Sequence, residues 1–152
     1  MANSLTGDRP MRRSFLAALL FLVCLGPALA EVRIVASPGG EATSFLDYFE
    51  TLRRSGERVV IDGPCFSACT LVFDVVPKRR ICVTRRAVLG FHAAKLVDRR
   101  TGEEFAAPEA TRAVARAYPA PIRAWIRRHG GLTGRPLFLY GRELAAMYPA
   151  CR

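Results

Sequence analysis

Residues 58–76 read RVVIDGPCFSACTLVFDVV, a stretch that predicts a strand, a sharp break and a helix in immediate succession. The apolar run Val59–Ile61 is typical of a buried strand. Asp62-Gly63-Pro64 breaks that strand, because glycine and proline end regular structure. Apolar residues fill most positions from Ser67 to Val76, which predicts a helix buried nearly all round and closed by Pro77. A strand followed at once by a buried helix is typical of an α/β protein.

The same alternation continues on both sides of this stretch. On the N-terminal side, a β-branched run over 32–36 predicts a strand, and apolar residues at helical spacing over 41–54 predict a helix. Further along the chain we expect strands at 80–84, 87–91 and 137–140, helices at 108–117, 121–129 and 142–147, and an exposed polar loop at 93–107. Continuous apolar strands joined by helices favour an α/β fold with parallel strands and crossover helices. The C-terminal helices are expected to pack outside the sheet.

The beginning of the chain has the pattern of a secretory signal peptide. Arg12 and Arg13 precede an apolar run from Phe15 to Leu25, and Ala28-Leu29-Ala30 is a small-x-small cleavage pattern. The apolar run is shorter than the roughly 20 residues that cross a bilayer. We therefore expect residues 1–30 to be a cleaved signal peptide and residues 31–152 to form one α/β domain that is periplasmic or secreted. An uncut membrane anchor is the alternative.

The chain is strongly basic, and a positive net charge can indicate an anionic partner such as nucleic acid. The formal net charge is +10, and the arginines occur in scattered pairs such as Arg53-Arg54 and Arg85-Arg86. Nucleic-acid binding predicts clustered positive charge with aromatic residues between the basic ones, and this chain has neither. The favoured interpretation is that these arginines form solvated surface, and we do not expect nucleic acid to be a partner. A nucleic-acid or anionic-surface binder is a hypothesis that rests on charge alone, and it ranks behind the two hypotheses given below.

Four cysteines follow the predicted signal peptide: Cys65, Cys69, Cys82 and Cys151. An even number of cysteines in an exported chain favours two disulfides, for which three connectivities are open. We favour Cys65–Cys69, which would clamp a short turn, together with Cys82–Cys151, which would hold the C-terminus. A zinc site formed by Cys65, Cys69 and a histidine is the alternative, although Cys-x3-Cys is a poor zinc spacing. We expect no metal and no cofactor.

Three features of the sequence carry the candidate chemistry. Ser37-Pro38-Gly39-Gly40 lies between a predicted strand and helix, where two glycine N–H groups can converge as in an oxyanion hole. Ser67 and Ala68 lie at the start of the buried helix, where the helix dipole favours negative charge. His92 follows the strand at 87–91 and is the side chain best suited to deprotonate a serine. Singly, the three features are most often a turn, an N-cap and a structural histidine.

The order of these features resembles the core of the Clp-type serine protease and crotonase superfamily. It resembles more closely the small exported bacterial members with a Cys-x-Ser-Ala-Cys turn, here Cys65-Phe66-Ser67-Ala68-Cys69. The resemblance covers Ser37 to His92, and more loosely Phe138–Ala145. It implies a Clp protease/crotonase-like fold, Ser67 as nucleophile, His92 as base, and the N–H groups of Gly39, Gly40 and Ala68 as the oxyanion hole. It further implies a peptide or acyl substrate and allows a homo-oligomer.

The chain departs from this family at the third member of the triad. The family's proteases place an aspartate just before the closing strand, where this chain has residues 133–137, TGRPL, with no carboxylate. Asp98, Glu103, Glu104 or the backbone are the candidates to orient His92 instead. Two hypotheses follow: an exported serine hydrolase, peptidase-like, with a Ser–His pair, or a non-catalytic exported domain that binds a peptide, an acyl group or a partner protein. The hydrolase is slightly favoured.

Overall fold

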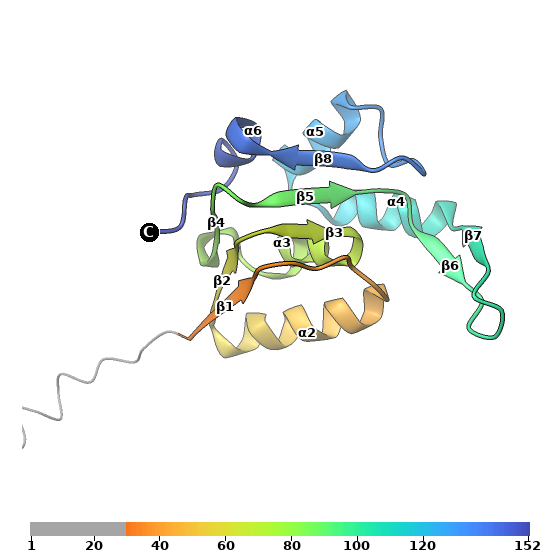
Figure 1. Ribbon diagram of the computed structural model, residues 1–152, viewed down its shortest axis with the longest axis horizontal. Coiled ribbons are helices and arrows are strands. Elements are labelled where there is room, and N and C mark those ends of the chain that lie inside the picture. Colours follow the sequence, from red (N-terminus) through yellow and green to blue (C-terminus); the bar gives the residue numbers. More distant parts are fainter. Residues whose placement is uncertain (1–29) are drawn as a thin grey trace, which may run out of the picture.

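The computed structural model describes residues 30–152, in which short strands alternate with helices (Figure 1). The strands are β1 (Glu31–Ile34), β2 (Arg58–Ile61), β3 (Pro64–Phe66), β4 (Ile81–Val83), β5 (Val88–Phe91), β6 (Lys95–Val97), β7 (Glu104–Ala106) and β8 (Leu137–Tyr140). The α-helices are α2 (Ala42–Ser55), α3 (Val72–Val75), α4 (Pro108–Ala117), α5 (Ala120–Arg128) and α6 (Gly141–Ala145). Two 3₁₀ helices, η1 (Ser67–Leu71) and η2 (Lys78–Arg80), complete the described elements. The predicted signal peptide lies outside the described residues, except for Ala30.

Two three-stranded sheets hold the elements in place. The first has the order β1-β2-β4 and is parallel throughout, with Ile34 opposite Ile61 and Ile61 opposite Val83. The second has the order β3-β5-β8, in which β3 and β5 are parallel and β8 runs antiparallel to β5. The arrowheads in Figure 1 show this reversal of β8. The α/β fold with parallel pairing and crossover helices is confirmed, with β8 as the one antiparallel member of these two sheets.

The link between β2 and β3 carries the chain from the first sheet into the second. Gly63 lies so close to Val35, the residue that follows β1, that a methyl group placed on Gly63 would be 2.0 Å from the Val35 carbonyl oxygen, so only glycine fits. Asp62 is buried beside it and accepts hydrogen bonds from Arg33, Thr84 and Arg86. Hydrogen bonds from these groups, led by Arg86, hold the pKa of the Asp62 carboxyl well below its usual range. This ion-paired carboxylate fixes the turn that leads into the candidate site.

The hydrophobic core lies between the sheets and the helices that cover them. Figure 1 shows α2 alongside β1, with α4 and α5 on the side of β5 and β8. Trp125 of α5 is buried, packs against Phe91 of β5 at 6.1 Å between ring centroids, and donates its indole N–H to Glu143. The helices α4 and α5 therefore pack outside the sheet, as predicted, and α5 buries one face that carries Ile122, Trp125 and Ile126.

Two local predictions were wrong. Residues 93–107, expected to be a loop, contain a β-hairpin of β6 and β7. Every residue of these two strands is exposed, so no alternation of buried and exposed positions marked them in the sequence. The break at Asp62-Gly63-Pro64 leads directly into β3, a strand of three residues that begins at a proline and was not predicted. The helix expected over 67–76 is present as η1 followed by α3.

Both disulfides have the favoured pairing. Cys65 bonds to Cys69 across the start of η1, and Cys82 of β4 bonds to Cys151. The C-terminal segment pairs with β4 as well, because the Cys151 amide donates to the Val83 carbonyl at 3.1 Å. With Cys65 and Cys69 bonded to each other, neither sulfur is a thiolate that could bind zinc. Between residues 30 and 152, no helix has the length and apolar character needed to cross a membrane.

Candidate functional site

Ser67 occupies a strained position at the end of β3. Its φ angle is 54°, and no other non-glycine residue between positions 30 and 152 has a positive φ. This left-handed conformation costs about 1 kcal/mol or more for a residue with a Cβ atom, and it persists only where the surroundings impose it. The N-cap of η1 is Phe66, and no side chain caps the helix. Ser67 is therefore not the N-cap that a serine before a helix usually is.

The glycine loop is fastened to the strand that precedes Ser67. The Ser37 amide donates to the Pro64 carbonyl at 2.8 Å, and the Phe66 amide donates to the Ser37 carbonyl at 3.0 Å. Gly39 has a φ of 88°, and a methyl group placed on it would lie 2.6 Å from the Ser67 Cβ atom. Only a glycine allows this approach, which brings the loop predicted for the oxyanion hole against the predicted nucleophile.

The three predicted oxyanion donors differ in their present partners. The Gly39 N–H donates to the Ser37 hydroxyl at 3.3 Å, so it is engaged within its own loop. Ala68 lies in the first turn of η1, where a backbone N–H has no acceptor within the helix. Gly40 donates to no backbone or side-chain group in the described part of the chain. Two of the three predicted donors, Gly40 and Ala68, are therefore available to a ligand without breaking a hydrogen bond.

His92 lies one residue beyond β5, the parallel neighbour of β3. In this pair Phe66 is opposite Gly90, so Ser67 and His92 both follow the carboxyl ends of adjacent strands. The carboxyl ends of parallel strands are where ligands bind in open α/β sheets. Among the described residues, the hydrogen bonds include none between the Ser67 hydroxyl and the His92 ring. The topology thus brings Ser67 and His92 to the same edge of the sheet, but no hydrogen bond joins their side chains.

A backbone carbonyl orients the His92 ring. The ring Nδ1 lies 2.7 Å from the Ala93 carbonyl oxygen, which can only accept a hydrogen bond, so Nδ1 carries the proton and Nε2 is the acceptor. Ala93 is itself fixed, because its amide donates to the Thr133 carbonyl at 2.8 Å. Thr133 belongs to the TGRPL stretch in which the carboxylate was missing. That stretch therefore supports the histidine through the backbone.

The three carboxylates considered as substitutes have other surroundings. Asp98 accepts the backbone N–H groups of Arg100 and Thr101, and these two bonds lower the pKa of its carboxyl. Glu104 pairs with Lys95 across the β6–β7 hairpin. Glu103 is exposed in the turn of the same hairpin. None of the three accepts a hydrogen bond from His92, whose Nδ1 is bonded to Ala93.

Two residues that the sequence did not single out support the Ser67 backbone. The Thr70 hydroxyl donates to the Ser67 carbonyl at 2.7 Å and lies 2.5 Å from the Tyr118 hydroxyl. Both side chains are buried, Thr70 completely. Burial raises the pKa of Tyr118 to about 12. The available signal was a tyrosine before Pro119 at the junction of two predicted helices, which says nothing about its partner 48 positions earlier.

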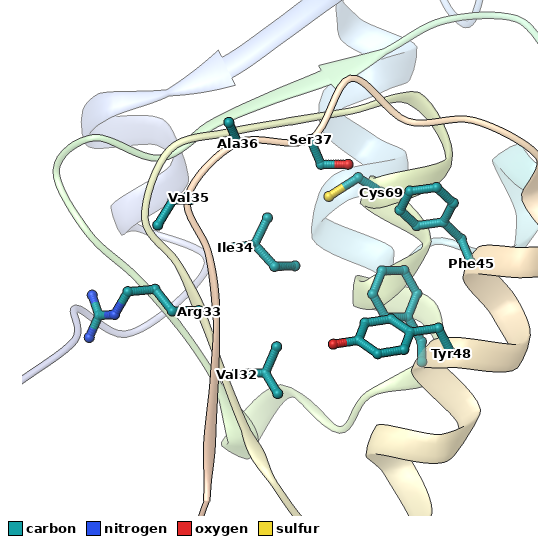
Figure 2. Close-up of a pocket in the computed structure, with 10 residues that line it drawn as sticks. Val32, Arg33, Ile34, Val35, Ala36, Ser37, Phe45, Tyr48 and Cys69 are labelled. Atoms are coloured by element: carbon teal, nitrogen blue, oxygen red, sulfur yellow. The ribbon is translucent and has the colours of Figure 1, made fainter.

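A cavity of about 250 Å³ lies between β1 and α2 (Figure 2). Alternate side chains of β1 point into it, aromatic side chains of α2 face them, and Arg33 points away. Its lining is Val32, Arg33, Ile34, Val35, Ala36, Ser37, Phe45, Tyr48, Phe49 and Cys69. Ser37 and Cys69 bring one end of the cavity next to the glycine loop and the disulfide, but neither Ser67 nor His92 lines it. The cavity is thus adjacent to the Ser67–His92 edge and separate from it.

Comparisons with known proteins add little to this geometry. No protein-family model matches the chain, and no curated protein matches it. Among solved structures, the chain is similar to a ClpP1 mutant from Listeria monocytogenes, at 15% sequence identity and a TM-score of 0.47. The alignment covers 91% of this chain and 81% of that chain. No group of three or more His, Cys, Asp or Glu within residues 30–152 is arranged to hold a metal ion.

Proposed function

We propose that this protein is an exported serine hydrolase, peptidase-like, with Ser67 as nucleophile and His92 as general base. The observation that carries the proposal is the strained left-handed backbone of Ser67, held against Gly39 at the carboxyl end of β3. Sharp, strained turns between a strand and a helix present a nucleophilic serine in other hydrolases. His92 follows the neighbouring parallel strand, with Nε2 available as the proton acceptor.

The chemical step uses only groups of this chain and water. His92 Nε2 takes the Ser67 proton as the serine Oγ bonds to the acyl carbon, and the carbonyl electron pair moves onto oxygen. The N–H groups of Gly40 and Ala68 bind that oxyanion. The electron pair then returns from the oxyanion to the carbonyl carbon and the bond to the leaving group breaks, while the imidazolium gives its proton to that group. Water attacks the acyl-enzyme by the same route, which breaks the ester bond to Ser67 and returns the proton to its hydroxyl.

The carbonyl of Ala93 takes the orienting role of the usual carboxylate. It holds the Nδ1–H tautomer, which is the tautomer that the step needs. A neutral carbonyl stabilises the imidazolium less than a carboxylate does, so we expect a slow enzyme. Closure of the Ser67–His92 hydrogen bond is expected on substrate binding, because such bonds are often long before the substrate is present.

A fluorophosphonate probe followed by peptide mapping tests the proposal. We expect the wild-type protein to be labelled at Ser67, and both Ser67→Ala and His92→Gln to lose that label. His129→Gln is the matched control, because His129 also bonds its Nδ1 to a backbone carbonyl, that of Trp125 at 2.8 Å. Absence of label at Ser67 in folded wild-type protein, or equal loss in the His129 variant, would contradict the proposal.

A non-catalytic binding domain on the same scaffold is the second candidate. It is favoured by the engaged Gly39 N–H and by the missing hydrogen bond between Ser67 and His92 within the described residues. This candidate predicts that a peptide or acyl ligand binds equally well to wild type and to Ser67→Ala, without turnover. Ester or peptide turnover that disappears in Ser67→Ala would exclude it.

Export is part of the proposal. Two disulfides are expected in an oxidising compartment, and residues 1–30 have the pattern of a secretory signal. We expect the mature chain to begin at Glu31 and to be periplasmic or secreted. Intact mass of the protein recovered from each cell fraction tests this, and a full-length chain in the cytoplasm would contradict it.

A further inference from the structure

Tyr118 is the side chain that connects the two halves of the candidate site. It lies in the short link between α4 and α5 and is 3% exposed. Its hydroxyl is 2.5 Å from the Thr70 hydroxyl, and its ring packs edge-on against Phe91 with centroids 5.2 Å apart. Phe91 immediately precedes His92, and Thr70 bonds the Ser67 carbonyl. One buried residue therefore supports both segments.

The direction of the hydrogen bonds follows from counting protons. The Ser67 carbonyl can only accept, so the single hydroxyl proton of Thr70 is used in the bond to it. The bond between Thr70 and Tyr118 must then be donated by the Tyr118 hydroxyl. The resulting chain runs from Tyr118 to Thr70 to the backbone of Ser67. Because the pKa of Tyr118 is raised to about 12, its donor proton is retained at neutral and mildly alkaline pH.

The position of Tyr118 is itself well fixed. Arg123 donates to the Tyr118 carbonyl at 2.8 Å and to the Arg116 carbonyl at 3.2 Å, which ties the end of α4 to α5. The ring is held on the other side by Phe91 of the core. A strained conformation such as that of Ser67 persists only where rigid surroundings impose it. Tyr118 has the rigidity for that role.

We propose that Tyr118, acting through Thr70 and Phe91, is a positioning residue that holds the Ser67 backbone and His92 in reactive geometry. This inference rests on the proposed hydrolase function. Tyr118 touches no reacting atom in it. Removing the Thr70 hydroxyl frees the Ser67 carbonyl, and removing the Tyr118 hydroxyl takes away the donor that orients Thr70. In either case the left-handed turn is less well held and can move the nucleophile away from the base.

The test compares variants that remove single hydroxyl groups. Tyr118→Phe and Thr70→Val are expected to lower the rate constant for fluorophosphonate labelling of Ser67 by about ten- to a hundredfold, the effect of a misplacement of about 1 Å. Thr70→Ser keeps the donor and is expected to stay within about threefold of wild type. Tyr148→Phe is the matched control, since Tyr148 is a second buried tyrosine that packs edge-on against a phenylalanine, Phe73.

The outcomes separate this inference from the proposed function. Labelling at the wild-type rate in Tyr118→Phe, or an equal loss in Tyr148→Phe, would overturn the positioning role while leaving the hydrolase intact. If the wild-type protein takes no label, the hydrolase proposal fails first. The positioning contacts are then measured by NMR of the same variants. Chemical-shift changes of the Ala68 amide and the His92 ring nitrogens in Tyr118→Phe, but not in Tyr148→Phe, support the role. Unchanged chemical shifts in Tyr118→Phe overturn it.

Discussion

A methyl group on Gly39 would lie 2.6 Å from the Cβ atom of Ser67, so the backbone of the glycine loop is in direct contact with the candidate nucleophile. The same methyl group would lie 2.6 Å from the Phe66 carbonyl oxygen and 3.1 Å from the Ala68 nitrogen. Two of these three atoms are backbone, which cannot swing aside as the end of a long side chain can. The contact fixes how far the loop lies from Ser67 and makes it testable by substitution.

Gly39→Ala is expected to disrupt the site, and Gly102→Ala serves as its matched control. Both glycines have positive φ angles, 88° and 74°, but Gly102 has no neighbour within 4 Å of an added methyl group. Urea denaturation should show a loss of about 1 kcal/mol for Gly102→Ala from backbone strain alone. Gly39→Ala should lose about 2 kcal/mol more from the clash. Equal losses in the two variants would contradict the contact.

Ser37→Ala should speed the labelling of Ser67. The Ser37 hydroxyl accepts the Gly39 N–H at 3.3 Å, which keeps that donor away from an oxyanion. A single oxyanion donor contributes about a hundredfold or more in rate, so release of a partly engaged one is expected to give a gain of about tenfold at most. The gain is measured by comparing the labelling rate of Ser67 in Ser37→Ala with the rate in the exposed control Ser44→Ala. An unchanged rate would show that Gly39 is not an oxyanion donor.

The two disulfides are expected to have different effects when removed. The chain-entropy model assigns about 4 kcal/mol of stability to Cys82–Cys151 and about 2 kcal/mol to Cys65–Cys69, because the first closes a far longer loop. Ser67 lies inside the shorter loop, so Cys65→Ala/Cys69→Ala should slow its labelling more than Cys82→Ala/Cys151→Ala does. Denaturation and labelling of both double variants give the comparison. A larger labelling defect in the second pair would contradict it.

Protonation of Asp62 should make the protein less stable in acid. Its folded-state pKa is depressed, chiefly by hydrogen bonds from Arg86 and Thr84, whereas an aspartate in the unfolded chain has a pKa of about 3.9. The carboxylate therefore contributes stability that is fully present above the unfolded value and is lost as the pH falls from there toward the depressed one. Melting temperatures between pH 6 and about pH 2.5 should fall less steeply in Asp62→Asn than in wild type. Asp47→Asn, at an exposed position on α2, should retain the wild-type slope.

The fold was largely predictable because its strands are short apolar runs with clear breaks. The strand at 137–140 and the helix at 108–117 have the predicted bounds, and both disulfides have the favoured pairing. The β6–β7 hairpin was missed because its exposed strands leave no burial pattern in the sequence. The strand β3 was missed because three residues that begin with a proline lack a strand signal.

Some features of the candidate site could likewise be predicted from the sequence, and others could not. The sequence by itself determined which residue types occur at the strand ends: the paired glycines, Ser67 at a helix start and His92 after a strand. Only the tertiary structure decided that Gly39 contacts Ser67, that the Ala93 carbonyl orients His92, and that Tyr118 reaches Thr70. Strand and helix signals are local in sequence, so they can be read from periodicity. Contacts between distant segments depend on how the sheets pair and the helices pack, and no local pattern encodes them.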